Sequence, residues 1–478
     1  MKKDSQVSLR VSFPFALLIS ALLAGCASAP TGHYYGKDES LLRSRGGLVG
    51  DAGVFHDVLY QPEAIALTFP GYIVGLEKSS RDVISRDAAG VLQNLEDEFV
   101  APSQQGVADA VARMSGQSKT HFISHVVKNF GTPFADGNCY LYSVYSARPD
   151  ANEGYVPTRP IEGCKGLATK ESSPAQAFFG SREAVDLLVD AIRADVAGGN
   201  RYTHVVFVVM GWNTAQIEAV RNFNSIVTNI RRAAHKEKAP FNPLFVGVTW
   251  ASQWDSDWLQ PMVTALGYTN KANDADEIGV SWLGDVVDRV SAATPGLPKV
   301  AIGHSFGARA LSMAICMGPQ FKGAMRGEGG RAVAPIDLFV GLQPAVSINR
   351  FLRDESREAI QYPNSCSAAK RVVLTASRGD KAVTTAFWAE MAGADDERRE
   401  VCEENPGRFG RSQICVSAKG DGRTQPAANE IPAEFVYVDA SRLVSFEQPN
   451  TSGKAHSDIY RQETGRFIWQ WFPNEKRR

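Results

Sequence analysis

Two periods of hydrophobic residues alternate along the chain from about residue 139 onward. Short and almost wholly apolar runs, bounded by Gly, Pro or charged residues, predict buried strands over 139–146, 203–210, 244–250, 300–302, 336–342, 371–376 and 434–438. Stretches with apolar residues three and four apart predict five helices. The first begins after Ser181, which we predict to be its N-cap. The other four cover about 214–232, 277–293, 308–317 and 460–471. This alternation predicts an α/β fold with a doubly wound, mostly parallel sheet.

The region before residue 136 shows a different pattern. Helical spacing recurs over 82–100 and 107–114, so we predict a helical N-terminal region at 54–135, ahead of the α/β domain at 136–478. An apolar run over 64–76 is interrupted by Pro70 and Gly71. It could dip into a membrane, but such runs are more often buried against the main domain, and we predict the latter.

Two histidines in this region have a spacing that can bind metal. His121 and His125 are four residues apart, which would place both on one face of a helix. A metal site needs further ligands, and the sequence offers no third ligand nearby. We therefore predict a surface or capping pair, no metal site and no cofactor.

The first residues have the pattern of an export signal. Basic residues precede an apolar run over 11–24, which is too short to span a bilayer, and Leu23-Ala24-Gly25-Cys26 follows. This ending resembles the lipobox of bacterial lipoproteins, and Ala27 resembles the outer-membrane class. The resemblance implies a signal peptide at 1–25, lipidation of Cys26, a Gly-rich tether at 26–53 and an outer-membrane location facing the periplasm or exterior. The alternative is an ordinary secretory signal cut near residues 27–29.

Composition and cysteine usage fit an exported globular protein. The formal net charge of −1 over 478 residues gives no reason to expect a nucleic-acid partner. Six cysteines remain after Cys26, an even number that permits disulfides in an exported chain. The local pairs Cys139 with Cys164 and Cys402 with Cys415 are the expected bridges. We predict that Cys316 is a small buried apolar residue.

The segment 299–310 combines a strand, a Gly-x-Ser-x-Gly motif and a helix. It reads Lys-Val-Ala-Ile-Gly-His-Ser-Phe-Gly-Ala-Arg-Ala, with Gly303, Ser305 and Gly307 forming the motif. A strained turn that exposes a serine between strand and helix needs glycines where the backbones approach closely. In this context the segment resembles the nucleophile elbow of serine α/β-hydrolases, the esterase and lipase class. A purely structural turn is the alternative.

A nucleophilic serine needs a base, and the base needs an acid that orients it. His456 is the one histidine after Ser305, and it lies in a loop between the last predicted strand and the terminal helix. Asp380 follows the strand at 371–376 and is the favoured acid, with Asp439 after the next strand as the second candidate. The family's order of Ser, then Asp or Glu, then His agrees with this choice.

The oxyanion of an acyl-transfer reaction needs two preorganised N–H donors. The resemblance places one at the backbone of Phe306 and the other in the turn after the 203–210 strand, at Trp212 or Asn213. The family usually has His-Gly at that turn, whereas this chain has Met210-Gly211. A backbone donor does not depend on that side chain.

The resemblance implies hydrolysis of an ester, or of a thioester or amide, through an acyl-enzyme. A small-molecule or lipid-like ester is then the partner, together with the membrane that holds the lipid anchor. Trp250, Trp254 and Trp258 could line an acyl pocket or simply pack, and we expect Asp255 and Asp257 to be solvated loop carboxylates. The alternative function is an inactive hydrolase-fold lipoprotein that serves as a binding or scaffold module.

Overall fold

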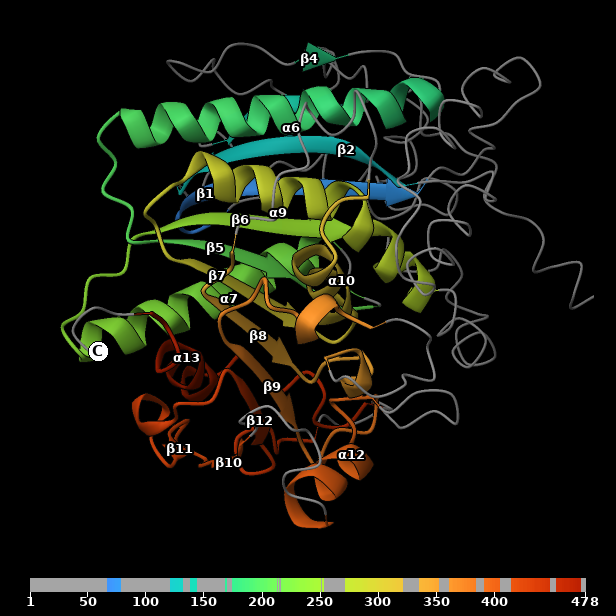
Figure 1. The fold of residues 1–478 in the computed structure, drawn as a ribbon. Coiled ribbons are helices and arrows are strands. Elements are labelled where there is room, and N and C mark those ends of the chain that lie inside the picture. The colour runs from blue at the N-terminus through green and yellow to red at the C-terminus, as the bar shows by residue number, and fades with distance from the viewer. Residues whose placement is uncertain are drawn as a thin grey trace, which may run out of the picture.

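A single large sheet organises the part of the chain that can be described. The computed structural model describes residues 67–78, 121–131, 138–143, 168–169, 174–212, 214, 216–250, 252, 271–320, 335–351, 361–383, 391–404, 414–447 and 453–473. Among these residues, twelve strands lie in the order β11-β10-β12-β9-β8-β7-β5-β6-β1-β2-β3-β4 (Figure 1). The chain therefore has an α/β fold with a mixed, mostly parallel sheet, as predicted.

Eight consecutive strands of this order are parallel to one another. They are β10 (Ile414–Ala418), β12 (Phe435–Asp439), β9 (Val372–Ala376), β8 (Leu338–Leu342), β7 (Lys299–His304), β5 (His204–Val209), β6 (Pro243–Trp250) and β1 (Pro70–Lys78). The edge strand β11 (Thr424–Gln425) is antiparallel to β10, and β2 (His121–Phe130) is antiparallel to β1. Beyond β2 follow β3 (Asn138–Ser143), again antiparallel, and β4 (Ala168–Thr169), parallel to β3.

Helices cover both faces of the sheet, because side chains of each strand alternate between two cores. Val205, Phe207 and Val209 of β5 belong to the core shared with α6 (Pro174–Ala197), α9 (Trp282–Ala293) and α10 (Phe306–Cys316). Val206 and Val208 belong to the other core, shared with α7 (Gln216–Lys236) and α13 (Gln462–Trp469). Short helical elements complete the C-terminal half: η6 (Ile348–Phe351), η7 (Pro363–Ser365), α12 (Asp395–Arg399), η8 (Glu400–Glu404) and η9 (Ala428–Glu430).

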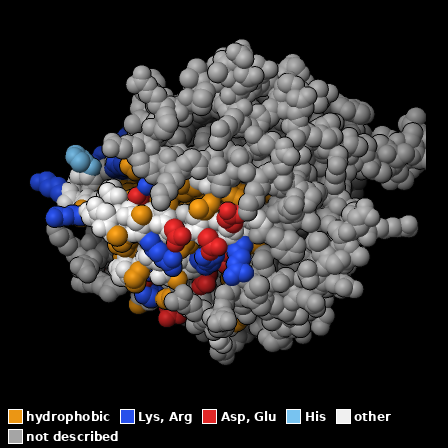
Figure 2. All heavy atoms as spheres, turned by 90° about the horizontal axis from the view of Figure 1, so that it is seen from above, with side chains coloured by type: hydrophobic (Ala, Val, Ile, Leu, Met, Phe, Trp, Pro, Cys, Tyr) orange, Lys and Arg blue, Asp and Glu red, His pale blue; other side chains and the backbone are white. Residues whose placement is uncertain are grey.

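The face seen from the side of α6 carries acidic and basic side chains close together (Figure 2). One such pair is Arg193 and Asp190, one turn apart on α6, with Nη1 and Oδ1 separated by 3.1 Å. Within the described residues, no helix is both long and apolar enough to cross a bilayer. The predicted signal peptide at 1–25, Cys26 and the tether at 26–53 lie outside the described residues.

The helical prediction for 54–135 is wrong where this region is described, and the helices predicted at 82–100 and 107–114 lie outside the described residues. The two described segments are strands β1 and β2, and both are buried parts of the main sheet. β1 pairs in parallel with β6, which lies more than 160 residues later in the chain, as in the pairing of Tyr72 with Val246. Helical periodicity within a short window carries no information about such long-range pairing. The described part of the apolar run, 67–76, is buried except at Thr68 and Pro70, in agreement with the prediction of burial against the main domain.

Two helix boundaries also differ from the prediction. Ser181 is not an N-cap, because α6 begins at Pro174 and the buried Ser181 hydroxyl instead accepts a hydrogen bond from the Ile123 N–H at 2.7 Å. The predicted helix at 277–293 is divided at Ser281, where one helical segment, 271–280, ends and α9 begins. Ser181 thus bonds a tertiary partner, Ile123, whereas the hydroxyl of Ser281 at the break bonds locally to the Glu277 carbonyl at 2.6 Å.

Two disulfides join described cysteines. The bridge between Cys402 and Cys415 is present as predicted. Cys316 is not a free apolar residue, because it forms a disulfide with Cys366. The two meet because the C-terminal end of α10 packs on the 361–369 segment, where the Tyr362 hydroxyl lies 2.6 Å from that of Ser312. Cys139 is also disulfide-bonded, and its predicted partner Cys164 lies outside the described residues.

Candidate active site

Ser305 occupies a strained turn at the C-terminal edge of the parallel strands. It lies between β7 and α10 with φ 54° and ψ −125°, and 7% of its surface is exposed. Positive φ is rare for residues other than glycine and costs on the order of 1–3 kcal/mol, so the surrounding structure must hold it in place. One such contact is the hydrogen bond from the Ser305 N–H to the Leu342 carbonyl of β8, at 3.0 Å.

The glycines on either side of Ser305 are required by close backbone contacts. A Cβ on Gly307 would lie 2.2 Å from the Val209 carbonyl oxygen, and one on Gly303 would lie 2.3 Å from the Ala308 Cα. Neither contact is with a flexible side chain that could move away. The motif therefore permits helix α10 to pack directly onto the ends of β5 and β7, which a larger residue would prevent.

His456 and Asp380 are brought together across 76 positions of sequence. The imidazole Nδ1 of His456 lies 2.8 Å from Oδ2 of Asp380. The backbone pairs the two loops as well, through hydrogen bonds from the Ala455 N–H to the Gly379 carbonyl at 3.0 Å and from the Lys381 N–H to the Gly453 carbonyl at 3.2 Å. Backbone hydrogen bonds between the two loops therefore accompany the contact between the His456 and Asp380 side chains.

The Asp380 carboxylate is almost wholly buried, with 1% of its residue surface exposed, and it is surrounded by donors. Oδ1 accepts hydrogen bonds from the N–H groups of Ala382 at 2.9 Å and Val383 at 3.2 Å. Oδ2 accepts from the side-chain amide of Gln343 at 3.3 Å in addition to His456. Because the carboxylate accepts, Nδ1 of His456 carries a hydrogen, and in the neutral imidazole Nε2 then has a lone pair that can take up a proton.

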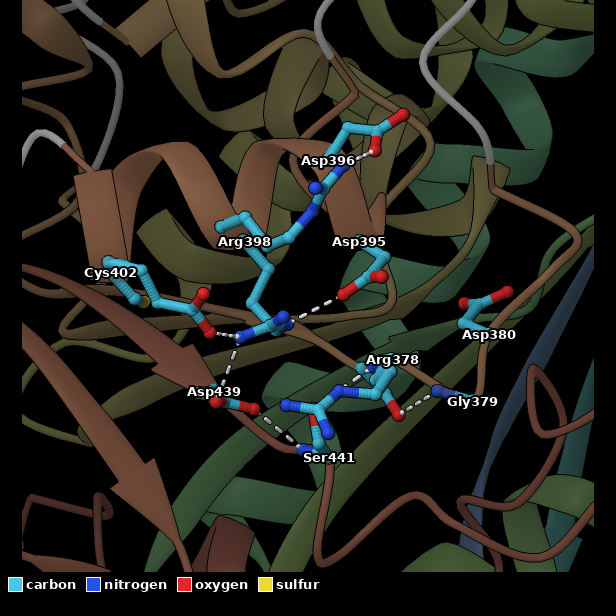
Figure 3. Close-up of polar contacts among 12 residues, drawn as sticks. Arg378, Gly379, Asp380, Asp395, Asp396, Arg398, Cys402, Asp439 and Ser441 are labelled. Carbon is cyan, nitrogen blue, oxygen red and sulfur yellow. Dashed lines mark hydrogen bonds and ion pairs between the residues drawn. The ribbon is translucent and has the colours of Figure 1, made fainter.

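Asp439, the second candidate for the acid, has different partners. Its Oδ2 lies 3.2 Å from Nη1 of Arg398, and its Oδ1 accepts from the Ser441 N–H at 2.9 Å. Arg398, which is almost fully buried, also contacts Asp395 and Glu403. Figure 3 shows Asp439 beside the Arg398 guanidinium and Asp380 away from it. The structure thus pairs Asp380, and not Asp439, with His456.

His456 also contacts the residue that precedes the serine. Nε2 of His304 lies 3.1 Å from the His456 carbonyl oxygen, and the two imidazole centroids are 4.5 Å apart with an interplanar angle of 38°. The His456 ring is in this way held beside the elbow. Among the described contacts, no hydrogen bond joins the Ser305 hydroxyl to His456, and such bonds are often loose before substrate binds.

The turn after β5 lies directly against Ser305. A Cβ on Gly211 would lie 2.6 Å from the Ser305 Cβ and 3.2 Å from its Oγ. The indole N–H of the buried Trp250 donates to the Met210 carbonyl at 2.9 Å, and the Trp212 ring packs edge-on against Phe306 with centroids 6.2 Å apart. The predicted oxyanion residues Phe306 and Trp212 are therefore neighbours. Asn213 lies outside the described residues, as do Trp254, Asp255, Asp257 and Trp258.

Gln343 is a residue of this site that the sequence did not reveal. Its φ of 46° turns the chain at the end of β8 toward Asp380. Besides its amide contact with Asp380, its side-chain oxygen accepts from the Thr375 hydroxyl at 2.7 Å. The sequence marks Gln343 only by its position, one residue past β8, the parallel strand next to β7.

A buried group of side chains that could bind a metal lies between the start of strand β2 and the helical segment 271–280. The prediction of a surface or capping pair on a helix is wrong, because His121 and His125 are both buried on strand β2. His121, Asp274 and Glu277 each offer one ligand atom within 4.8 Å of the others, and this group does not include His125. However, Nζ of Lys78 lies 2.6 Å from Oδ1 of Asp274, and Nζ of Lys271 lies 3.1 Å from Oδ2. Burial raises the pKa of Asp274, but the two lysines outweigh it and bring this pKa below its usual range. We assign the group to structural ion pairs.

Comparison with known proteins supplies no family for the chain. It matches no protein-family model, and a search of curated proteins finds no related sequence. The function must therefore follow from the residues of the site.

Proposed function

We propose that the protein is a serine hydrolase that cleaves an ester, or a thioester or amide, through an acyl-enzyme intermediate. The observation that carries this proposal is a serine at φ 54° in a strand–turn–helix elbow, where the preceding residue, His304, contacts His456, a histidine whose Nδ1 is 2.8 Å from a buried carboxylate. A strained serine conformation and a buried charged group are both unfavourable for stability, and together they favour a catalytic role.

In the proposed reaction, Ser305 Oγ attacks the substrate carbonyl carbon while Nε2 of His456 takes up the hydroxyl proton. When the tetrahedral intermediate collapses, the bond to the leaving group breaks and His456 returns the proton to the leaving oxygen, sulfur or nitrogen. Water then attacks the acyl-enzyme by the same route, with His456 as the base, and the acid product leaves with Ser305 restored.

Asp380 orients and stabilises His456 in this reaction. It holds the imidazole with the hydrogen on Nδ1, so that Nε2 is available to Ser305, and its negative charge favours the imidazolium formed during attack. Three neutral donors, Ala382 N–H, Val383 N–H and the Gln343 amide, satisfy its remaining acceptor sites.

The developing oxyanion would be stabilised by backbone N–H groups at the start of α10 and in the turn after β5. Phe306 N–H is the first donor, and Trp212 or Asn213 supplies the second. The contact between Gly211 and the Ser305 side chain supports this assignment, because it brings the β5 turn to the nucleophile. Trp250 steadies the same turn through the Met210 carbonyl.

The proposal extends to the fold family and the location. Nucleophile, acid and base follow the strands β7, β9 and β12 in the order of α/β-hydrolases, which supports that fold. We further propose a bacterial cell-envelope protein held in the membrane by lipid on Cys26, acting on a small-molecule or lipid-like ester. If processing is insensitive to globomycin, or if Cys26→Ser leaves the protein membrane-bound, this anchor is not used.

A fluorophosphonate probe tests the chemistry directly, because it reacts with activated serines. The wild type is expected to be labelled on Ser305, and Ser305→Ala is expected to lose both labelling and turnover of short-chain p-nitrophenyl esters. Ser312→Ala is the matched control, since Ser312 is a buried serine on the same helix with its hydroxyl on Tyr362. Labelling that persists in Ser305→Ala would refute the assignment.

The alternative of a non-catalytic binding or scaffold module makes the opposite prediction. A folded wild-type protein would then take no serine probe and would hydrolyse no member of a panel of esters, thioesters and amides. Such a result would replace the hydrolase proposal.

A further inference from the structure

His304 is the residue of the elbow to which the proposed reaction gives no role. It is the last residue of β7, and Val300 and Ile302 of this strand belong to the core on the side of α7 and α13. Side chains two positions apart on a strand share a face, so His304 projects toward that side as well. Ala455, next to the base, belongs to the same core. The strand register therefore directs the His304 imidazole at the loop that carries His456.

The hydrogen bond between these residues determines the state of His304. A carbonyl oxygen can only accept, so Nε2 of His304 carries the hydrogen that it donates to the His456 carbonyl at 3.1 Å. Nδ1 of His304 is buried and makes no hydrogen bond to any described residue. Burial, together with the neighbouring His456, lowers the pKa of His304 well below its usual value. His304 is thus a neutral imidazole with its hydrogen on Nε2.

The same imidazole covers one face of the base. The two ring centroids are 4.5 Å apart, while the Nδ1 edge of His456 faces Asp380 at 2.8 Å. The ring of His456 is consequently confined on one edge by a carboxylate and on one face by a flat neutral ring. Its backbone carbonyl is bonded to that same ring, so both the ring and the backbone of the base depend on His304.

We propose that His304 is a positioning residue for His456, which holds the base by its carbonyl and packs against its ring. The inference rests on the proposed function, since it concerns the geometry of the proposed base. Transfer of the serine proton depends on placing Nε2 of His456 within hydrogen-bond reach of Oγ, and misplacement by about 1 Å can lower the rate roughly a hundredfold.

Other side chains meet only part of this requirement. Phenylalanine would supply the flat ring but leave the His456 carbonyl without its donor. Glutamine can place an amide nitrogen near the position of Nε2 but offers no ring. Lysine or arginine would introduce a positive charge beside the imidazolium that forms during attack, which is unfavourable at this distance. A neutral histidine supplies the donor and the ring together.

The test compares His304→Phe and His304→Gln with the wild type in p-nitrophenyl ester turnover, with active sites counted by fluorophosphonate titration. His304→Phe is expected to lower kcat by about tenfold or more with KM changed less than about twofold, because the base is misplaced while substrate contacts remain. His304→Gln keeps the donor and is expected to recover about a third or more of the wild-type kcat. If the Phe variant does not fold, His304→Met, which also lacks the donor, takes its place.

The chain provides a matched control in His204. This histidine is also buried on a parallel strand and also places Nε2 3.1 Å from a backbone carbonyl, that of Pro473. It lies at the opposite, N-terminal end of β5, away from Ser305. His204→Phe is expected to keep the wild-type kcat per titrated site, whatever it does to stability.

The outcomes separate this inference from the proposed function. If the wild type is labelled on Ser305 but His304→Phe has the wild-type kcat, the positioning role is wrong and the hydrolase proposal stands. If the Gln and Phe variants lose kcat equally, the hydrogen bond to the His456 carbonyl does not position the base, and the inference is overturned. If the wild type itself takes no probe, the proposed function fails first.

Discussion

The disulfide between Cys316 and Cys366 should contribute more to the free energy of unfolding than the other described bridge, between Cys402 and Cys415. Cys316 is the last residue of α10, the helix that begins directly after Ser305, so this bridge joins α10 to the 361–369 segment. We consider replacing both cysteines with alanine, and compare this with the same replacement of Cys402 and Cys415. Alanine avoids the burial of new hydroxyl groups.

The expected magnitudes follow from the loop that each bridge closes. A disulfide restricts the unfolded chain more when its loop is longer, and loop-closure entropy for a separation of 50 residues corresponds to about 4 kcal/mol at 25 °C. For the 13-residue separation between Cys402 and Cys415 the same relation yields about 3 kcal/mol. Both Cys316 and Cys366 are buried, so loss of packing adds to the larger value.

Urea unfolding followed by tryptophan fluorescence, without reductant, measures both differences in the free energy of unfolding. The Cys316→Ala/Cys366→Ala variant should lose about 1 kcal/mol or more beyond the Cys402→Ala/Cys415→Ala variant. Mass spectrometry of alkylated protein provides the control that the remaining bridge is intact. Equal losses, or a smaller loss for the longer loop, would refute the reasoning from loop length and burial.

Three further predictions concern the acid, the elbow and a buried carboxyl group. Asp380→Asn should lower kcat by about ten-thousandfold, because the amide favours the wrong tautomer of His456, whereas Asp439→Asn should change kcat less than about twofold. Ester turnover at pH 7 measures both variants, and equal losses would contradict the choice of Asp380. Gly307→Ala should lower the free energy of unfolding in urea by about 3 kcal/mol or more, since its Cβ would lie 2.2 Å from the Val209 carbonyl oxygen. If the variant unfolds with the same free energy as the wild type, this close contact is not present. Burial raises the pKa of Asp285 to about 7, so its ionisation opposes folding as the pH rises from about 4 to above 7. Asp285→Asn should therefore be more stable than the wild type at pH 8, with an advantage that shrinks toward pH 4; a pH-independent difference in thermal unfolding would show that Asp285 is not the cause.

Local patterns were sufficient for the elements around the elbow. The apolar strand, the glycines of the motif and the helix that follows are consecutive in sequence, so short-range spacing describes them. His456 was found for a related reason, because it is the one histidine after Ser305. Parallel strands end at one edge of the sheet, which made Asp380 a candidate before its contact with His456 was known.

Other parts of the site depend on residues that are distant in sequence. Asp380 and Asp439 both follow a parallel strand, and only the contacts of Arg398 and His456 distinguish them. Gln343 reaches Asp380 because its positive φ turns the chain back, and no motif marks that position. The partner of Cys316 was missed for the same reason, since its neighbour is 50 residues away.

The sequence by itself determined the alternation of strands and helices, the strand–turn–helix at Ser305 and the order of the proposed serine, acid and base, because these follow from local periodicity and strand ends. Only the tertiary structure decided that β1 and β2 join the sheet, that Asp380 holds His456 and that His304 packs against the base. The physical reason is that strand pairing, ion pairs and ring contacts form between residues that are distant in sequence. The hydrophobic period of a short segment depends only on that segment, so it does not predict which distant residues it will contact.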